Sequence, residues 1–404
     1  MDATTNRTII RTNVGSRFFT LAIVLLIAVC VCVPFAPKAA YADMAVPGLS
    51  YVFDHEDKAA FTKDFMYWPC GQGVALDYVG HSKTVTVPAK FKGKKVIYAY
   101  LGGDQITSVN VSKASSLEAL FVYGAIKTLD TTKNRQLKYL VCGSNKLTKL
   151  DVSKNSKLKY FNCSDNKLTK LDVSKNPNLK YLYCVGNGLT KLDVSKNPNL
   201  LDLNCARNKL TKLNVTKSPK LKSLYCEENK LTKLNVTKNP RLSNLYCSRN
   251  RLTKLYVTKN PRLSNLDCSR NRLTKLNVTK NPRLESLGCS RNRLTKLYVT
   301  KNPKLSELNC SRNRLTKLNV AKNAKLWELS CGHNKLTSLD VTKNASLYSV
   351  YCNNNKLATL KLAKPDSKYD IDYSGNPNIK VTWPGKLNTQ GGGKLVAQGI
   401  VDFS

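Results

Sequence analysis

The apolar positions between residues 96 and 363 repeat with a period of 21 residues. Each period holds two copies of a shorter pattern, L-x-x-L-x-[C/V]-x-x-N, as residues 179–199 show. The second leucine and the following Cys or Val are two positions apart, so both side chains face the same side of an extended strand. Each period therefore predicts two short extended segments that are joined by two asparagine-containing turns.

Proline excludes a helix from the second of these turns. In six periods a proline directly follows the second asparagine, where it removes an amide proton and restricts the residue before it. These residues are Pro177, Pro198, Pro240, Pro261, Pro282 and Pro303. We predict little or no helix in this part of the chain.

Eleven cysteines mark the period: Cys142, Cys163, Cys184, Cys205, Cys226, Cys247, Cys268, Cys289, Cys310, Cys331 and Cys352. An asparagine follows each of them three residues later, and the register continues in Tyr373 and Asn376. A fixed period of this length is typical of stacked repeats. One repeat cannot fold alone, so its neighbours must supply contacts and hydrogen bonds, and the two ends need caps.

The first 42 residues have the features of a signal peptide. Three arginines within the first 17 residues precede an apolar stretch, 21–33, and a small-x-small site, 40–42. An uncleaved anchor is the alternative, but a bilayer needs about 20 apolar residues. We predict a mature chain from Asp43 that has no membrane span and is secreted or retained non-covalently at the cell surface.

The mature chain divides into three parts. Residues 43–95 predict a strand-rich N-terminal cap, with Trp68 and the alternating run 83–88 as its clearest features. Residues 96–363 form the repeat array, and residues 364–404 predict a C-terminal cap and tail.

The string L-x-x-L-x-C-x-x-N-x-L-T-x-L-D/N-V-S/T-K-N-P, as in residues 158–178, resembles the bacterial leucine-rich repeat proteins of the cysteine-ladder, internalin J type. The resemblance covers residues 117–378. It implies a β-rich solenoid, a right-handed superhelix with a parallel sheet on its concave side. It also implies a secreted or surface protein that binds other macromolecules. The chain departs from those surface proteins in lacking a sorting tail and in its high positive charge.

The cysteine column predicts a ladder of free, buried thiols. Adjacent strands lie about 4.8 Å apart, whereas a disulfide needs Cβ atoms about 3.8 Å apart, and the count in the array is odd. A linear column without histidine also lacks the tetrahedral ligand set of a zinc site, so we predict no metal and no cofactor. The asparagine column predicts a second ladder, whose side chains satisfy the backbone groups of the turns.

The outward positions of the first extended segment carry no Lys or Arg between residues 160 and 351. Tyrosine, serine and asparagine predominate there, and such residues supply rigid aromatic area and adaptable hydrogen bonds to binding surfaces. The alternative is that tyrosine merely suits an exposed strand. We predict contacts with a protein or glycan on a host or bacterial surface through Tyr160, Tyr181, Tyr183, Tyr225, Tyr246 and Tyr351.

The turns, by contrast, are strongly basic. The net charge is +40, and removal of the first 42 residues, with four basic residues and one acidic residue, leaves +37. Such a charge attracts polyanions such as teichoic acid, sulfated or sialylated glycans, or nucleic acid. The alternative is that repeat duplication copied a solubilising residue. The candidate anion-binding residues flank the asparagines of four repeats: Arg249, Arg251, Arg270, Arg272, Arg291, Arg293, Arg312 and Arg314.

No constellation of residues points to catalysis. The three histidines, His55, His81 and His333, lie in unrelated contexts, and no glycine-rich phosphate loop or nucleophile elbow is present. We therefore predict a non-catalytic leucine-rich repeat protein for macromolecular recognition or adhesion. The alternative function is electrostatic binding of polyanions through the basic turns.

Overall fold

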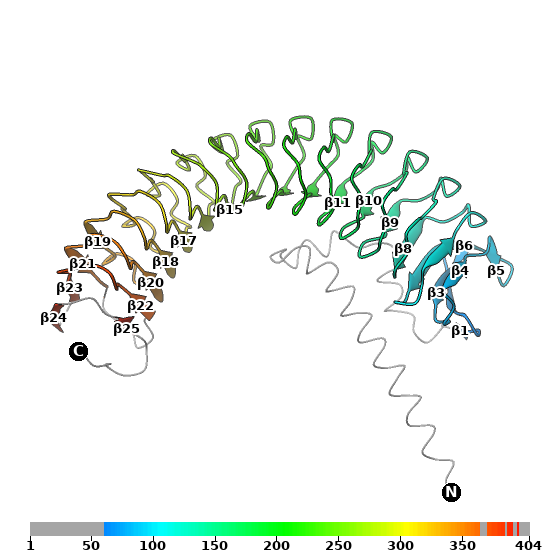
Figure 1. The fold of residues 1–404 in the computed structure, drawn as a ribbon, viewed down its shortest axis with the longest axis horizontal. Helices are drawn as coiled ribbons and strands as arrows, with labels where there is room; N and C mark the ends of the chain where they lie inside the picture. Colours follow the sequence, from blue (N-terminus) through cyan, green and yellow to red (C-terminus); the bar gives the residue numbers. More distant parts are fainter. Residues whose placement is uncertain (1–59, 364–369, 384–385, 391–393, 396–404) are drawn as a thin grey trace, which may run out of the picture.

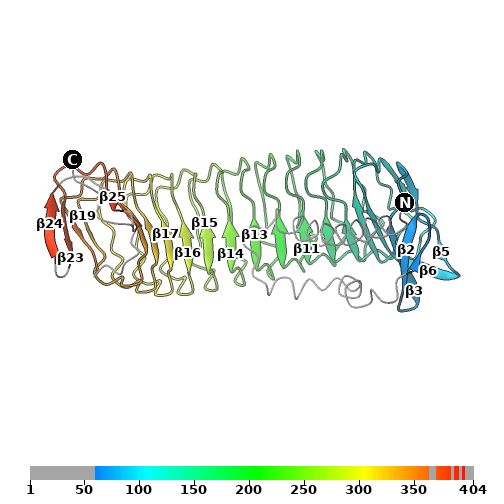
Figure 2. The same ribbon diagram turned by 90° about the horizontal axis from the view of Figure 1, so that it is seen from below.

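The computed structural model describes residues 60–363, 370–383, 386–390 and 394–395, and these form a curved solenoid (Figure 1). The predicted signal peptide, residues 43–59 of the predicted cap, and residues 364–369, 384–385, 391–393 and 396–404 of the predicted C-terminal cap and tail lie outside these residues. None of the described residues is helical, and each repeat contributes one coil (Figure 2).

One strand from each coil forms a parallel sheet on the inner side of the arc (Figure 1). The register advances by one period per strand, so that Phe161 pairs with Leu182 and Leu182 with Leu203. The strands are β8 (Ala119–Tyr123), β9 (Tyr139–Val141), β10 (Tyr160–Asn162), β11 (Tyr181–Tyr183), β12 (Asp202–Asn204), β13 (Ser223–Tyr225), β14 (Asn244–Tyr246), β15 (Asn265–Asp267), β16 (Ser286–Gly288), β17 (Glu307–Asn309), β18 (Glu328–Ser330), β20 (Ser349–Tyr351) and β22 (Asp370–Asp372). The predicted solenoid with a concave parallel sheet is confirmed.

Antiparallel strands close both ends of this sheet. At the N-terminal end β3 pairs antiparallel with β2 and parallel with β6. β6 in turn pairs in parallel with β8, the first strand of the repeat sheet. At the other end β25 pairs antiparallel with β22. These end strands are β1 (Ala60–Phe61), β2 (Phe65–Cys70), β3 (Gly73–Tyr78), β5 (Lys90–Phe91), β6 (Lys94–Gly102) and β25 (Lys394–Leu395). The antiparallel strands pair with the backbone N–H and C=O groups of the first and last parallel strands, which would otherwise be exposed edges of the sheet.

The second extended segment of each coil forms ladders only near the ends of the array. Two parallel ladders occur there, β4 with β7 and β19 with β21 and β23; β24 then pairs antiparallel with β23. Between them the described coils show only isolated bridges, such as Asp193 with Asn214. These segments lie on the outer side of the arc, where coils spread apart, which accounts for the sparse pairing in the middle of the array (Figure 1). The bounds are β4 (Thr84–Thr86), β7 (Ser108–Asn110), β19 (Ser338–Asp340), β21 (Thr359–Lys361), β23 (Lys380–Trp383) and β24 (Lys386–Gln390).

The core is a continuous stack of leucine, valine and cysteine side chains. In a central coil Leu245, Cys247, Leu252 and Val257 are all 0% exposed. The eleven ladder cysteines are free and buried, as the spacing argument predicted. Burial raises the pKa of their thiols, to about 12 at Cys142. The cysteines therefore act as small apolar side chains rather than as reactive groups.

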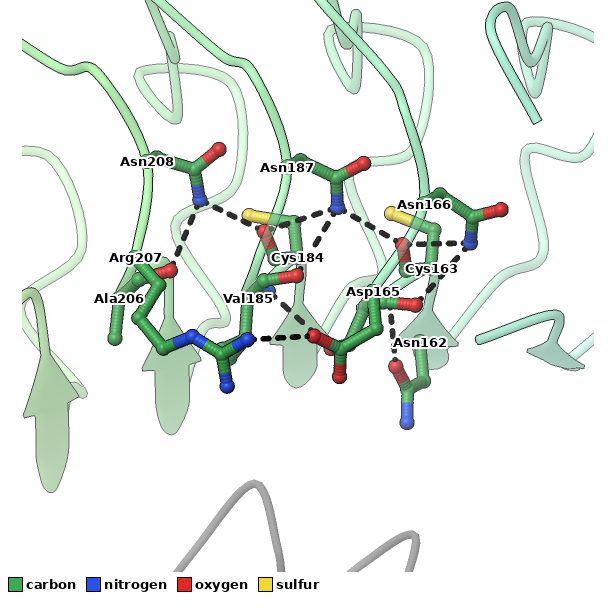
Figure 3. Close-up of polar contacts among 11 residues, drawn as sticks. Asn162, Cys163, Asp165, Asn166, Cys184, Val185, Asn187, Ala206, Arg207 and Asn208 are labelled. Carbon is green, nitrogen blue, oxygen red and sulfur yellow. Dashed lines mark hydrogen bonds and ion pairs between the residues drawn. The ribbon is translucent and has the colours of Figure 1, made fainter. Parts of the chain in front are cut away.

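The first asparagine of each coil joins that coil to its neighbours (Figure 3). Asn166 Nδ2 donates to the carbonyl oxygens of Cys142, 2.9 Å away in the preceding coil, and Cys163, 3.1 Å away in its own. Its Oδ1 accepts from the backbone N–H of Leu147 at 2.9 Å. The same arrangement recurs through Asn376, which confirms the predicted asparagine ladder.

The second asparagine of each coil forms another ladder. Asn176 Nδ2 donates to the carbonyl oxygens of Val152 and Asn155 in the preceding coil, both at 2.9 Å. Side chains in this column are 0% exposed, so the bonds form away from water. Most coils thus carry two buried amides that hold them in register with the coil before. In one coil Ser218 takes the second position and donates through Oγ to Asn197 O at 3.1 Å.

Replacing Asn250 with alanine should destabilise the array strongly. The change removes the acceptor for Leu231 N, 2.9 Å away, and leaves this buried N–H unpaired. It also removes one of the two amides that donate to Cys226 O, which keeps the bond from Asn229. The unpaired donor and the lost bond together cost roughly 1.5 to 4.5 kcal/mol. Chemical denaturation measures the loss. The matched control is Asn235→Ala, whose exposed side chain caps a turn and should cost about 0.5 to 1.5 kcal/mol. Equal losses would contradict the ladder's role.

Alkaline pH should destabilise the protein through the thiol ladder. Burial raises the pKa of the Cys142, Cys310 and Cys352 thiols from 9.0 to about 12. Above pH 9 the unfolded state releases these protons and the folded state keeps them, so stability is lost between pH 9 and 12. Each thiol should contribute about 1.4 kcal/mol of loss at pH 10.

Denaturation of the reduced protein at pH 8 and pH 10 tests this expectation. The triple replacement of Cys142, Cys310 and Cys352 by alanine should make the loss between the two pH values about 4 kcal/mol smaller. Lysine deprotonation is common to both proteins and cancels in the comparison. An unchanged difference would show that the thiols do not govern the alkaline response.

Candidate macromolecule-binding surfaces

The concave face carries an aromatic cluster over its N-terminal half. Tyr160 lies 6.0 Å from Tyr181 and 5.4 Å from Tyr183, measured between ring centroids. Tyr225 and Tyr246 stack almost in parallel, with centroids 5.0 Å apart and planes 7° from each other. Five of the six predicted tyrosines therefore belong to one cluster, because neighbouring strands bring their outward side chains together.

These tyrosines differ in how much surface they present. Tyr160, Tyr183 and Tyr225 are only 5–6% exposed, whereas Tyr181 and Tyr246 are half-buried. The sequence analysis missed further aromatic members of the cluster on the preceding strands. These are Tyr98, Tyr100, Phe121, Tyr123 and Tyr139. They precede or begin the cysteine column, so the repeat pattern did not mark them.

Tyr351, the sixth predicted tyrosine, lies apart on β20. Its hydroxyl donates a hydrogen bond to the Asp370 carboxylate on β22, and this bond is the main cause that raises the pKa of Tyr351. The side chain is therefore held by the neighbouring strand and is not part of the aromatic cluster.

Between the cluster and β20, the concave face is polar and then acidic. Asn265 Nδ2 donates to Asn244 Oδ1 at 2.8 Å. Asn244 in turn donates through its Nδ2 to Ser223 Oγ at 3.2 Å. Further along, Glu307 and Glu328 are paired in register on adjacent strands. Burial, and then the Glu307 charge, raise the pKa of Glu328. The face is thus mainly aromatic over its N-terminal half, where Asp202 lies on β12, and carries Asp267, Glu307 and Glu328 on later strands.

The basic turns border this face. Arg249, Arg270, Arg291 and Arg312 come directly before the ladder asparagines, and Arg251, Arg272, Arg293 and Arg314 come directly after them. All eight side chains are exposed. The structure therefore arranges them as two parallel columns, one residue of each kind per coil.

The first of these columns changes in charge along the array. Arg207 pairs with Asp165 at 3.2 Å (Figure 3), and Arg249 pairs with Glu228 at 3.4 Å. The next three members, Arg270, Arg291 and Arg312, follow one another and form no ion pair with any residue that the structure describes. Like charges in adjacent coils repel, and a bound anion would relieve this repulsion.

This column also has an unusual backbone conformation. Arg270, Arg291 and Arg312 have φ values of 54°, 52° and 54°, in the left-handed region that favours glycine. Gly186 occupies the same turn position in an earlier coil, with a φ of 62°. A side chain other than glycine costs about 1 kcal/mol here. Residues other than glycine occupy this position in most described coils, among them Asp165, Glu228 and His333, so the left-handed conformation belongs to the repeat and does not single out arginine.

The outer segment of each coil carries a third set of columns. Asp151 Oδ1 accepts from the backbone N–H of Ser153 at 2.8 Å and so caps the second turn. In a later coil Asn277 makes the equivalent bond to Thr279 at 3.0 Å. The hydrogen bond that caps the turn is the same in both coils, but the side chain that accepts it is charged at Asp151 and neutral at Asn277. Aspartate occupies the capping position at 151, 172 and 193, and asparagine occupies it at 214, 235 and 277.

Two tyrosines interrupt the capping column, and the sequence analysis missed them. Tyr256 and Tyr298 are 61% and 60% exposed on the outer segment. The signal that would have found them is the change from Asp or Asn to an aromatic residue at one fixed repeat position. The sequence analysis also missed Trp327 and Tyr348, which directly precede β18 and β20. Their side chains are 40% and 50% exposed.

No group of three or more His, Cys, Asp or Glu residues in the described part of the chain is arranged to hold a metal ion. Over the same described residues, no helix has the length and apolar character that a membrane crossing needs.

Comparison with known proteins supports the fold. The family described as leucine-rich repeats (2 copies) matches residues 156–197. No match was found among curated protein sequences. An internalin, InlF from Listeria monocytogenes, is 21% identical with a TM-score of 0.56, over 68% of this chain and 88% of that one. A leucine-rich repeat protein of Leptospira interrogans is 21% identical with a TM-score of 0.53, over 69% and 88%. These two similarities concern the fold alone.

A further solved structure shares both the fold and the ladder. The functional domain of InlJ from Listeria monocytogenes, which includes a cysteine ladder, is 36% identical to this chain. The alignment covers 64% of this chain and 67% of that one, with a TM-score of 0.50. The 21-residue period, the buried cysteine column and this identity agree, and the chain belongs to the internalin J-like, cysteine-ladder family of leucine-rich repeat proteins.

Proposed function

We propose that this protein is a secreted or surface-retained, non-catalytic recognition protein that binds a protein partner through its concave sheet face. Residues 1–42 supply the export signal in this proposal. The family relationship supports recognition of macromolecules, and the composition of the concave face supports a protein partner.

The observation that carries the proposal is the character of the concave face in a chain of net charge +40. The outward positions from β10 to β20 carry no Lys or Arg, although basic residues border them in the turns. Aromatic side chains gather at one end and carboxylates at the other. Protein interfaces concentrate binding energy in a few aromatic residues surrounded by polar groups, and this face has that arrangement.

Within the aromatic cluster, Tyr181 and Tyr246 are the preferred contact residues. Both are half-buried, so each ring is held by its neighbours and still presents surface. Preorganised rings lose little conformational entropy on binding. The buried members Tyr160 and Tyr225 position these contact residues by packing against them, Tyr160 against Tyr181 and Tyr225 against Tyr246.

The double variant Tyr181→Ala/Tyr246→Ala should lose partner binding while the solenoid remains folded. Truncation of an aromatic contact residue at an interface costs about 2 kcal/mol or more, which is at least a 30-fold loss of affinity. The experiment compares the proteins captured by mature wild-type chain, by this variant and by Lys301→Ala/Lys322→Ala from the opposite turns. A partner lost only with the tyrosines supports the proposal. A capture pattern unchanged by the tyrosine variant contradicts it.

We propose polyanion binding through the turn arginines as a second function, because three of them follow one another without a described ion-pair partner. Arg270, Arg291 and Arg312 occupy the same turn position in adjacent coils. Their mutual repulsion costs stability, and a polyanion that runs along the column would offset it. Teichoic acid, sulfated or sialylated glycans and nucleic acid all provide such a charge array.

Replacing Arg270, Arg291 and Arg312 with asparagine tests this second function. Asparagine tolerates the left-handed turn, and Asn354 occupies the same position with a φ of 52°, so folding should be retained. With double-stranded DNA as the probe, the slope of log affinity against log salt should fall by about 2 to 3, because three phosphate contacts are lost.

The matched control removes three lysines from the opposite turns, Lys259, Lys280 and Lys301. It changes the net charge by the same amount. If the two triple variants reduce the salt slope equally, the arginine column is not a specific anion site.

A further inference from the structure

The outer surface of the array carries two isolated aromatic side chains. Tyr256 and Tyr298 are 61% and 60% exposed, more than any other large hydrophobic side chain that the structure describes. Their inward neighbours Leu255 and Leu297 are buried in the core, so the tyrosines point away from it. They lie two coils apart, with Asn277 at the same position in the coil between them.

These tyrosines stand where the fold favours a capping residue. Asn235 and Asn277, at this position in nearby coils, accept the backbone N–H two residues later at 3.0 Å. A tyrosine side chain has no oxygen at the distance from the backbone that this bond requires. The coils that contain Tyr256 and Tyr298 therefore lack the side-chain cap at this turn and present an exposed aromatic ring in its place.

Lysines accompany the tyrosines. Lys254, Lys275 and Lys296 are exposed and lie two residues before the capping position, on the same outward side of the segment. The capping position itself carries no acidic residue between Asp193 and Asp340. A strip of rings and ammonium groups, with one amide between the rings, thus runs along the outer surface.

We propose that this strip binds an acidic polysaccharide. The tyrosine rings offer flat apolar faces for the C–H faces of sugar rings, and the three ammonium groups pair with sulfate or carboxylate groups. Asn277 uses Oδ1 for its turn, and its Nδ2 is a donor for a sugar hydroxyl. The rings supply a contribution that salt does not screen, whereas the lysines supply one that salt weakens.

The spacing favours a polysaccharide over a single-stranded nucleic acid. Coils lie about 4.8 Å apart at the sheet and farther apart on the outer side, so the two rings are separated by at least about 10 Å. Bases in a stacked strand follow at about 3.4 Å, and single-strand binding proteins enclose them in a groove. Two separate rings on an open, convex surface suit a polymer of alternating sugars better than a stack of bases.

This inference goes beyond the two proposed functions and uses none of their residues. The concave tyrosines lie on the inner side of the arc, and the outer strip lies on the second segment (Figure 1). The turn arginines lie between these two segments in each coil. Each site can therefore fail its test without affecting the others.

The test is the double variant Tyr256→Asn/Tyr298→Asn in the mature chain. Asparagine restores the cap found in neighbouring coils, so the variant should fold at least as well as the wild type. Net charge is unchanged, so any loss of binding belongs to the rings. The reciprocal variant Asn277→Tyr adds a third ring between the first two and should strengthen binding.

Binding is measured with heparin oligosaccharides, with inorganic polyphosphate and with oligothymidine, each at low and at high salt. The proposal expects a loss of about tenfold for heparin that is similar at both salt concentrations, because salt does not screen the ring contacts. Polyphosphate affinity should change by less than twofold. Unchanged heparin affinity overturns the proposal. A greater loss for oligothymidine than for heparin also overturns it and assigns the rings to base stacking. The Arg270→Asn/Arg291→Asn/Arg312→Asn variant should retain the tyrosine-dependent part of heparin binding, which separates this site from the arginine column.

Discussion

The register between neighbouring coils depends on hydrogen bonds from buried asparagine amides. Most coils place one amide in each of their two turns, and each amide donates to backbone carbonyls of the preceding coil. Ser218 replaces the second amide in one coil. These groups are shielded from water, so a shift of one residue would leave several donors and acceptors unpaired in every coil. The strict period of the cysteines and asparagines follows from this constraint, because an insertion in the core-forming part of one coil would break the bonds on both sides of it.

The same constraint determines how the surface is organised. In-register stacking places equivalent residues of successive coils beside one another, so every outward position becomes a column along the solenoid. The same substitution in a few adjacent coils therefore changes the charge or polarity of a continuous strip of the surface. The concave face, the turn arginines and the outer segment are therefore three separate surfaces, each with its own sequence of charges and rings, on one shared core.

The columns show which features the fold itself requires and which it leaves free. At the outer capping position Asp193 and Asn214 preserve the same turn with different charges, so the charge is not a structural requirement. At the left-handed turn position the backbone favours glycine, as at Gly186, yet arginine stands there in five later coils and other residues stand there in most of the rest. Positions where the residue departs from the local preference are candidates for function, because the fold alone does not account for them.

The sequence by itself determined the period, the extended segments, the absence of helix in the array, the cysteine ladder and the first asparagine ladder. These follow from side-chain alternation and from the requirement that buried polar groups be hydrogen-bonded. The sequence also identified six of the concave tyrosines and eight of the turn arginines as outward-facing, but not Arg207. Only the tertiary structure decided that the second segments form ladders near the ends of the array and that Tyr160 and Tyr225 are packed while Tyr246 presents surface. It likewise revealed the left-handed arginines and the exposed Tyr256, because backbone torsion and exposure depend on contacts between coils that no single repeat contains.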